Sequence, residues 1–190
     1  MKKFPVWRLL IAAVIYAVLF VPASACGMIH PACYAYVGTV VPLLFSFIYL
    51  YSCAQWQHPG AASILNCMLL AIGFIAVEGN LPFAVIIVVV TVLAEILRKV
   101  MKYNTLKGVR VSFVPFAFSF YAYSAHWWFE TENSLAEAVG EMPAGYADKM
   151  SVVIDNIPVL VLMLALTVPV AILGMRIAEK AMKKQTALLK

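Results

Sequence analysis

The sequence predicts an all-α fold: a polytopic membrane protein built as one bundle of six transmembrane helices. Apolar residues make up 64% of the 190 positions, charged residues only 12%, and the mean hydropathy is +0.93. Apolar stretches about as long as a bilayer is thick recur along the chain. Most charged residues lie in the connections or at the ends of these stretches, divided by sign. A water-soluble domain carries about twice this share of charge, so that class is excluded.

A transmembrane helix needs about 20 mostly apolar residues, and six stretches approach this length. Turn-forming segments rich in Gly, Pro and Asn separate several of them, such as residues 57–60 and 78–82. No internal repeat or linker divides the chain, so residues 1–190 form a single domain. The predicted spans are residues 7–23, 34–54, 61–77, 83–100, 112–129 and 154–178. The long connection 130–155 carries acids, and we expect a short surface helix over 134–139.

In this predicted topology, the basic residues lie on one face of the membrane. An even number of crossings returns both termini to the same face, and all 14 Lys and Arg residues except Lys149 belong to that face. The positive-inside rule places it, with both termini, in the cytoplasm. All nine acids except Glu95 and Glu179 lie at or near the opposite face. The net charge of +5 comes from clusters at helix ends that meet lipid headgroups, so we expect no nucleic-acid partner.

The first predicted span permits two interpretations. A basic start at Lys2 and Lys3, an apolar core and small residues before Cys26 also resemble a cleavable signal peptide. The span interpretation is preferred, and the orientation of the remaining helices is the same in either case.

Cysteine and histidine residues suggest further alternatives in the first outer connection. Cys26 and Cys33 flank His30, so a disulfide or a soft-metal site is possible there. Two Cys and one His fall one ligand short of a closed zinc site, and Cys packs well among apolar side chains. Packing is therefore the favoured interpretation, with no metal and no cofactor expected.

Motifs for common catalytic chemistry are absent from the sequence, which contains no H-E-x-x-H, G-x-S-x-G or Walker glycine loop. We therefore expect no enzyme activity. Glu95 lies deep in the fourth predicted span, where an acid is a functional candidate. Arg98 and Lys99 follow at i+3 and i+4, so a local ion pair is the expected explanation.

Polar and aromatic residues gather at the outer ends of the third, fifth and sixth spans. An aromatic belt at the headgroups is one explanation. The other is an outward-facing pocket whose rings stack on a planar solute while polar groups orient it. Asn156 has a further explanation as a helix cap. The candidate solute-binding residues are Glu78, Asn80, Tyr121, Tyr123, His126, Trp127, Trp128, Glu130 and Asn156.

The layout resembles a known family. A basic start, an alanine-rich first helix, five further short hydrophobic helices, a long acidic connection ending in Gly145–Met150 and a basic tail after Gly174 are similar to an S component of an energy-coupling-factor transporter. Within that group the chain most resembles the MptD family, also called Trep-Strep integral membrane proteins. The most specific part of the resemblance runs from Phe113 to Met150.

The resemblance implies a transport role in the bacterial cytoplasmic (inner) membrane. An S component captures a small, vitamin-like micronutrient from outside, docks on a transmembrane coupling subunit and releases the solute inside as two ATPase subunits work. The family's docking surface contains small residues in an A-x-x-x-A pattern, which Ala13 and Ala17 match, with Ala12 alongside. Small residues at i and i+4 also let any two membrane helices approach closely. The alternatives are a membrane assembly or scaffold protein without a solute, and a small membrane redox or metal protein.

Overall fold

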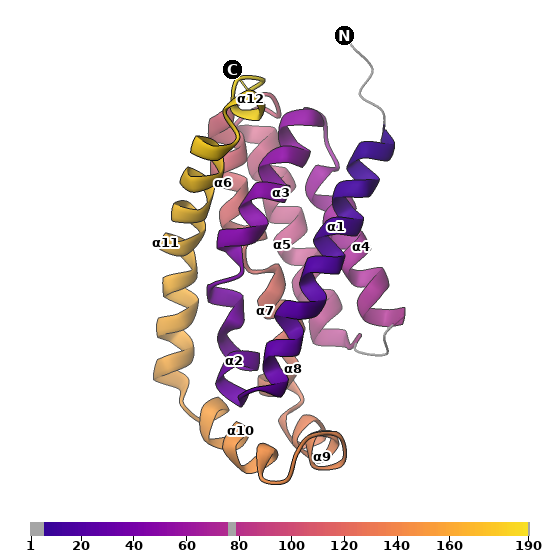
Figure 1. Ribbon diagram of the computed structural model, residues 1–190, viewed down its shortest axis with the longest axis vertical. Coiled ribbons are helices and arrows are strands. Elements are labelled where there is room, and N and C mark those ends of the chain that lie inside the picture. The colour runs from indigo at the N-terminus through magenta and orange to yellow at the C-terminus, as the bar shows by residue number, and fades with distance from the viewer. Residues whose placement is uncertain (1–5, 76–78, 190) are drawn as a thin grey trace.

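The computed structural model describes residues 6–75 and 79–189, and these residues form an all-helical bundle (Figure 1). Most of the long helices run along one axis. The elements are α1 (Val6–Ala25), η1 (Cys26–Met28), α2 (Pro31–Tyr36), η2 (Val37–Thr39), α3 (Pro42–Gln55), α4 (Ala61–Ile75), α5 (Leu81–Val100), α6 (Leu106–Phe116), α7 (Ser119–Ser124), α8 (His126–Phe129), α9 (Thr131–Glu141), α10 (Tyr146–Ile154), α11 (Ile157–Ala181) and α12 (Lys183–Thr186).

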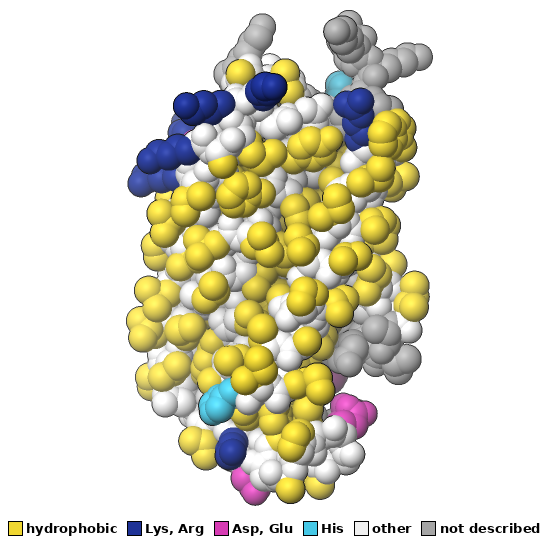
Figure 2. All heavy atoms as spheres, in the orientation of Figure 1, with side chains coloured by type: hydrophobic (Ala, Val, Ile, Leu, Met, Phe, Trp, Pro, Cys, Tyr) yellow, Lys and Arg dark blue, Asp and Glu magenta, His cyan; other side chains and the backbone are white. Residues whose placement is uncertain are grey.

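The two ends of the bundle differ in charge. We call the end where α1 begins, α5 ends, α6 begins and α11 ends the basic end, because the described Lys and Arg residues other than Lys149 lie on these elements or beside them. We call the opposite end, formed by α9 and α10 with η1 and α8, the acidic end. Figure 2 shows the separation, with an apolar surface between the two ends.

The bundle has the features of a membrane protein. Four helical segments in the described residues are long and apolar enough to cross a bilayer: Val6–Met28, Pro31–Gln55, Leu81–Val100 and Ile157–Ala181. Their outward faces carry exposed Val, Leu and Ile side chains, as expected for helices that contact lipid. The all-α membrane class is thereby confirmed, but four such segments are found where the sequence predicts six spans. Helix α4 is apolar but shorter.

The predicted fifth span, residues 112–129, is not one helix. It is divided among α6, α7 and α8, and Ala117 and Phe118 separate the first two. Pro115 lies in the last turn of α6, where it donates no backbone hydrogen bond, and the α-helix ends at the next residue.

The predicted long connection, residues 130–155, is mostly helical. Helix α9 is longer than the expected surface helix over 134–139, and α10 occupies the remainder. Gly145, with φ of 76°, makes the turn between them in a backbone conformation that glycine adopts without strain. Helix α11 begins at Ile157 because the Asn156 side chain accepts a hydrogen bond from the Val159 amide at 3.3 Å.

Small residues allow the helices to pack closely. Helix α1 packs on α4 and α3. Ala13 and Ala17 are completely buried and Ala12 is 4% exposed. Ala13 and Ala17, which were expected to belong to a docking surface, therefore lie inside the bundle, where they serve the packing of α1. Ala12 is also largely buried, but it lines an apolar groove on the outer side of α1. Gly174 has the same role in α11, since a Cβ there would lie 2.9 Å from the backbone of Pro42 and Leu43.

A buried asparagine connects four helices in the middle of the bundle. Asn66 of α4 donates from Nδ2 to Thr91 Oγ1 of α5 at 2.7 Å and to Ser119 Oγ of α7 at 3.0 Å. Its Oδ1 accepts from the Tyr16 hydroxyl of α1 at 3.5 Å. Polar groups at this depth require such partners, because lipid supplies none.

Charged groups at the basic end bind the backbone of neighbouring elements. Glu95 Oε1 accepts from the amides of Ala62 and Ser63 at the start of α4, at 2.9 and 3.4 Å. Arg98 is completely buried, and its Nη2 donates to the carbonyls of Trp56 and Tyr103 at 3.2 and 3.3 Å. Among the described residues Glu95 forms no ion pair with Arg98 or Lys99, so the expected local pair is wrong: the carboxylate caps α4 and the Arg98 guanidinium binds two connections.

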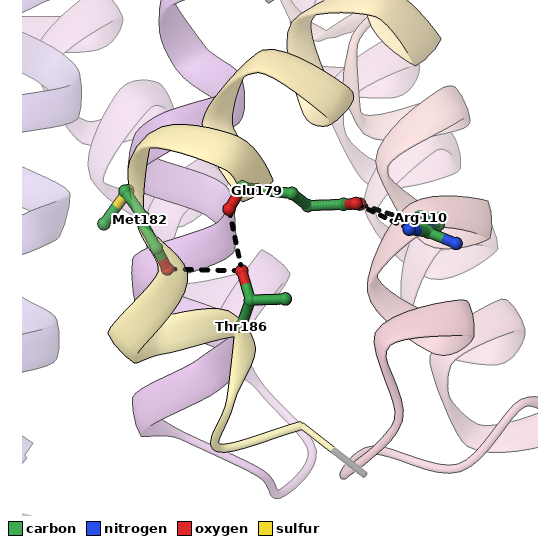
Figure 3. Close-up of polar contacts among 4 residues, drawn as sticks. All are labelled: Arg110, Glu179, Met182 and Thr186. Carbon is green, nitrogen blue, oxygen red and sulfur yellow. Dashed lines mark hydrogen bonds and ion pairs between the residues drawn. The ribbon is translucent and has the colours of Figure 1, made fainter.

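Helices α6 and α11 are joined at the same end by an ion pair (Figure 3). Arg110 Nε and Nη2 donate to the two carboxylate oxygens of Glu179 at 2.7 and 2.6 Å. The Thr186 hydroxyl lies within hydrogen-bond distance of the carbonyls of Glu179 and Met182, which anchors α12 on α11.

Candidate functional site

Two adjoining cavities open at the acidic end beneath α9. Their volumes are about 380 and 270 Å³. Because the two cavities adjoin, their combined volume is in the range of small-molecule sites. They share His126, Ser134 and Glu137. The polar cavity is also lined by Gly79, Asn80, Glu130, Asn133 and Ala136. The aromatic cavity is also lined by Val21, Ser24, Ala25, Gly27, Met28, Tyr34, Tyr123, Trp127, Ala138, Glu141 and Met142.

Three rings form the deep wall of the aromatic cavity. Tyr34 of α2 lies 5.3 Å from the Tyr123 ring and packs edge-on against Trp127, with centroids 5.4 Å apart. All three side chains are buried. Tyr123, His126 and Trp127 are spaced i, i+3 and i+4, which places them on one side of the α7–α8 segment. The cavity can therefore accommodate a planar solute against aromatic surfaces.

His126 organises the wall that the cavities share. Its Nδ1 lies 2.8 Å from Ser134 Oγ and its Nε2 lies 3.4 Å from the Tyr34 hydroxyl. Ser134 Oγ also lies 3.2 Å from the His126 carbonyl, to which it donates. This network is satisfied by a neutral imidazole that donates from Nδ1 and accepts from Tyr34 at Nε2. His126 thus joins α2, α8 and α9, and in its neutral form it adds no positive charge to the cavities.

The Trp127 indole has an unused donor. The side chain is 2% exposed and lines the aromatic cavity, and its buried Nε1 has no hydrogen-bond partner among the described residues. Leaving such a donor unsatisfied costs about 1–3 kcal/mol. The atom has no accessible surface in this structure, so a solute acceptor or an ordered water recovers that free energy only when neighbouring side chains move aside.

Carboxylates and amides form the outer rim. Glu137 and Glu141 line the aromatic cavity, while Glu130, Asn80 and Asn133 line the polar cavity. The sequence did not predict Ser134, Glu137 and Glu141 as site residues. Their spacing of i, i+3 and i+7 places them on one face of α9, a signal that a helix extended beyond 134–139 would have revealed.

Several predicted site residues lie elsewhere. The Tyr121 hydroxyl is hydrogen-bonded to Thr39 Oγ1, and Trp128 Nε1 donates to the Ile154 carbonyl at 3.2 Å, so both face α2, η2 and α10. Asn156 caps α11. Glu78 lies outside the described residues. The structure does bring Asn80, Tyr123, His126, Trp127 and Glu130 together around the two cavities.

Tyr146 links the α9–α10 segment at the acidic end to the rest of the bundle. The buried Tyr146 hydroxyl donates to the Gly27 carbonyl of η1 at 2.8 Å. Burial raises the pKa of Tyr146 to about 12, so the phenol keeps its proton and remains a donor at neutral pH. This bond holds the start of α10 beside the aromatic cavity.

The first outer connection contains free cysteines. Cys26 and Cys33 are both unpaired in the structure, and the Cys26 thiol donates to the Pro22 carbonyl at 3.5 Å. Within residues 6–75 and 79–189, no three His, Cys, Asp or Glu side chains are grouped closely enough to hold a metal ion.

Comparison with known proteins identifies the family. A family model described as a hypothetical bacterial integral membrane protein (Trep_Strep) matches residues 7–187. No curated protein matches the chain, and neither does any solved structure. Nearly the whole chain is covered, and the described helices carry the apolar spans that such a protein needs. The chain therefore belongs to the Trep_Strep family of bacterial integral membrane proteins.

Proposed function

We propose that this protein is the solute-capturing S component of an energy-coupling-factor importer. In this proposal the chain crosses the bacterial cytoplasmic membrane six times, with the basic end in the cytoplasm and the acidic end outside. The passes are α1, α2 with α3, α4, α5, the broken α6–α8 segment, and α11. The positive charge at one end supports this orientation.

The pair of cavities at the acidic end carries the proposal. A scaffold protein anchored by an aromatic belt has no need of a recessed site, whereas here rings form a deep wall and polar groups form a rim. The unsatisfied Trp127 donor supports solute binding, because it gains a partner when an acceptor enters. Capture from outside, docking on a transmembrane coupling subunit and release driven by two ATPase subunits complete the proposed cycle.

Docking requires an exposed surface, and α1 supplies one on its lipid-facing side. Trp7, Ile11 and Ile15 of α1 line an apolar groove of about 390 Å³ together with α3 and Met182. We place the contact with the coupling subunit on this side of α1 rather than at the buried Ala13 and Ala17.

The test is native mass spectrometry of the protein purified gently in detergent from its own host. We expect a retained molecule of a few hundred daltons at one per chain, and co-purified ATPase and coupling subunits. Trp127→Phe removes the indole donor but keeps an aromatic ring, so it should lower occupancy. Trp128→Phe is the matched control, since that indole binds the Ile154 carbonyl and lies outside both cavities. An empty wild-type protein without partner subunits would favour the scaffold alternative.

A further inference from the structure

We infer that the solute is a planar cation that also carries a hydrogen-bond acceptor, bound with its ring in the aromatic cavity and its positive charge beside Glu137 and Glu141. This inference rests on the proposed function and specifies the chemical class that the site selects. It follows from the charges around the cavity, the ring surfaces and the unused donor.

The formal charges around the two cavities have one sign. Glu130, Glu137 and Glu141 line them, and no Lys or Arg is among the described lining residues. His126 does not change this balance, because its two ring nitrogens face Ser134 and Tyr34 in a network that a neutral imidazole satisfies. An anionic solute would meet only repulsion from these carboxylates, whereas a cation would be attracted.

The aromatic wall selects for a cation in a second way. The electron-rich faces of Trp and Tyr attract a positive charge held within about 6 Å of the ring centroid. Tyr34, Tyr123 and Trp127 line the same cavity as Glu137 and Glu141, so one solute can contact both groups. A flat ring also matches the aromatic surfaces better than an aliphatic amine does.

The Trp127 donor adds the third requirement. Its Nε1 is buried without a described partner, and a cation that lacked an acceptor would leave this group unsatisfied. A ring bearing a carbonyl or an unprotonated ring nitrogen supplies the missing acceptor. The carboxylate and the indole donor therefore recognise opposite ends of the same small molecule.

Three matched probes test the charge requirement: 1-methylnicotinamide is a planar cation with a carbonyl acceptor, nicotinamide is neutral and nicotinate is an anion. Binding is measured by quenching of tryptophan fluorescence on purified protein in nanodiscs. We expect the cation to bind at least about tenfold more tightly than the anion, with nicotinamide between them. The preference should fall as salt rises, because both carboxylates are exposed.

Matched variants locate the effect. In the double variant Glu137→Gln, Glu141→Gln the preference should fall to about threefold or less. Glu132→Gln removes an exposed carboxylate of the same helix that lines neither cavity, so it should keep the preference. Unchanged thermal unfolding of the double variant would show that the fold is retained.

Nicotinate binding as tightly as the cation, no binding of the cation at all, or a preference that survives in the double variant would each overturn the charge assignment. These outcomes are distinguishable from failure of the proposed function. A solute retained in native mass spectrometry would still establish capture even if its charge were negative.

Discussion

The two ends of this bundle use polar residues in opposite ways. At the basic end, Arg98 and Glu95 bind backbone groups of neighbouring elements, and Arg110 pairs with Glu179. At the acidic end, carboxylates and amides surround two cavities, and a buried indole donor has no described partner. Unpartnered polar atoms occur at both ends, since Glu95 Oε2 and Arg98 Nε and Nη1 also lack described partners. The difference lies in the surroundings: buried charges at the basic end contact neighbouring connections, whereas carboxylates at the acidic end line two cavities.

Removing Arg98 gives the strongest test of this comparison. Arg98→Ala leaves the carbonyls of Trp56 and Tyr103 without their donor. It also removes a positive charge that interacts with the Glu95 carboxylate. We expect the free energy of unfolding to fall by about 3 kcal/mol, measured by thermal or denaturant unfolding in detergent. Arg176→Ala removes an exposed charge from the same end and should change it by less than about 0.5 kcal/mol. Equal effects of the two variants would contradict the structural role of Arg98.

Two glycine substitutions compare packing inside the bundle with packing at the acidic end. Gly174→Ala should destabilise the protein by about 1–3 kcal/mol, since the new Cβ meets the backbone of α3. Gly140→Ala in α9 meets no atom within 4 Å and should stabilise that helix by up to about 1 kcal/mol. Differential scanning fluorimetry of both variants measures the contrast. A destabilised Gly140 variant would show that α9 is packed more tightly than its surroundings indicate.

Tyr146→Phe tests the hydrogen bond that links α10 to η1. Loss of the hydrogen bond to the Gly27 carbonyl should cost about 1 kcal/mol and increase hydrogen exchange in α9 and α10. Tyr51→Phe, at the basic end, is the control and should leave exchange in α9 and α10 unchanged.

The same tyrosine predicts a pH dependence. Burial raises the pKa of Tyr146 to about 12, above its ordinary value of 10. Its contribution to stability is therefore fully present below pH 10 and is lost as pH rises through about 12. The Tyr146→Phe variant should lose less stability than the wild-type protein across that interval.

The smallest effect is expected at the ion pair between α6 and α11. Glu179→Gln removes its charge, but Arg110 is 52% exposed, so solvent screens the interaction. We expect a loss of about 0.5–1 kcal/mol that diminishes in high salt. A loss as large as that of Arg98→Ala would show that the basic end depends on surface pairing rather than on its buried charge.

Much of the fold follows from local sequence patterns. Apolar length predicted the long helices. An even number of crossings predicted that the start of α1 and the end of α11 share one end, as in Figure 1, while the side of the membrane on which they lie stays a prediction. The positions of breaks depended on tertiary contacts. Gly38, for example, lies against the Tyr121 ring at the interruption between α2 and α3, and no local pattern identified this approach.

The candidate site was harder to predict because one aromatic run serves two sides of the bundle. Helical spacing groups Tyr123, His126 and Trp127 on the cavity side, whereas Tyr121 and Trp128 face the other way. The sequence reveals this division only when its helical phase is considered. The contribution of Tyr34 comes from a distant helix, and nothing in its neighbourhood along the chain marks it as a site residue.

The Asn66 connection has a mechanical consequence. Sliding any one of α1, α4, α5 or α7 along its neighbours would break a hydrogen bond in hydrocarbon, where no water replaces it. The central bundle should therefore be stiff to shear, with elastic deformation concentrated at the acidic end, where the helices are short and interrupted. Under the proposed function, such a bundle would move in the bilayer as a nearly rigid body while its acidic end deforms to admit a solute.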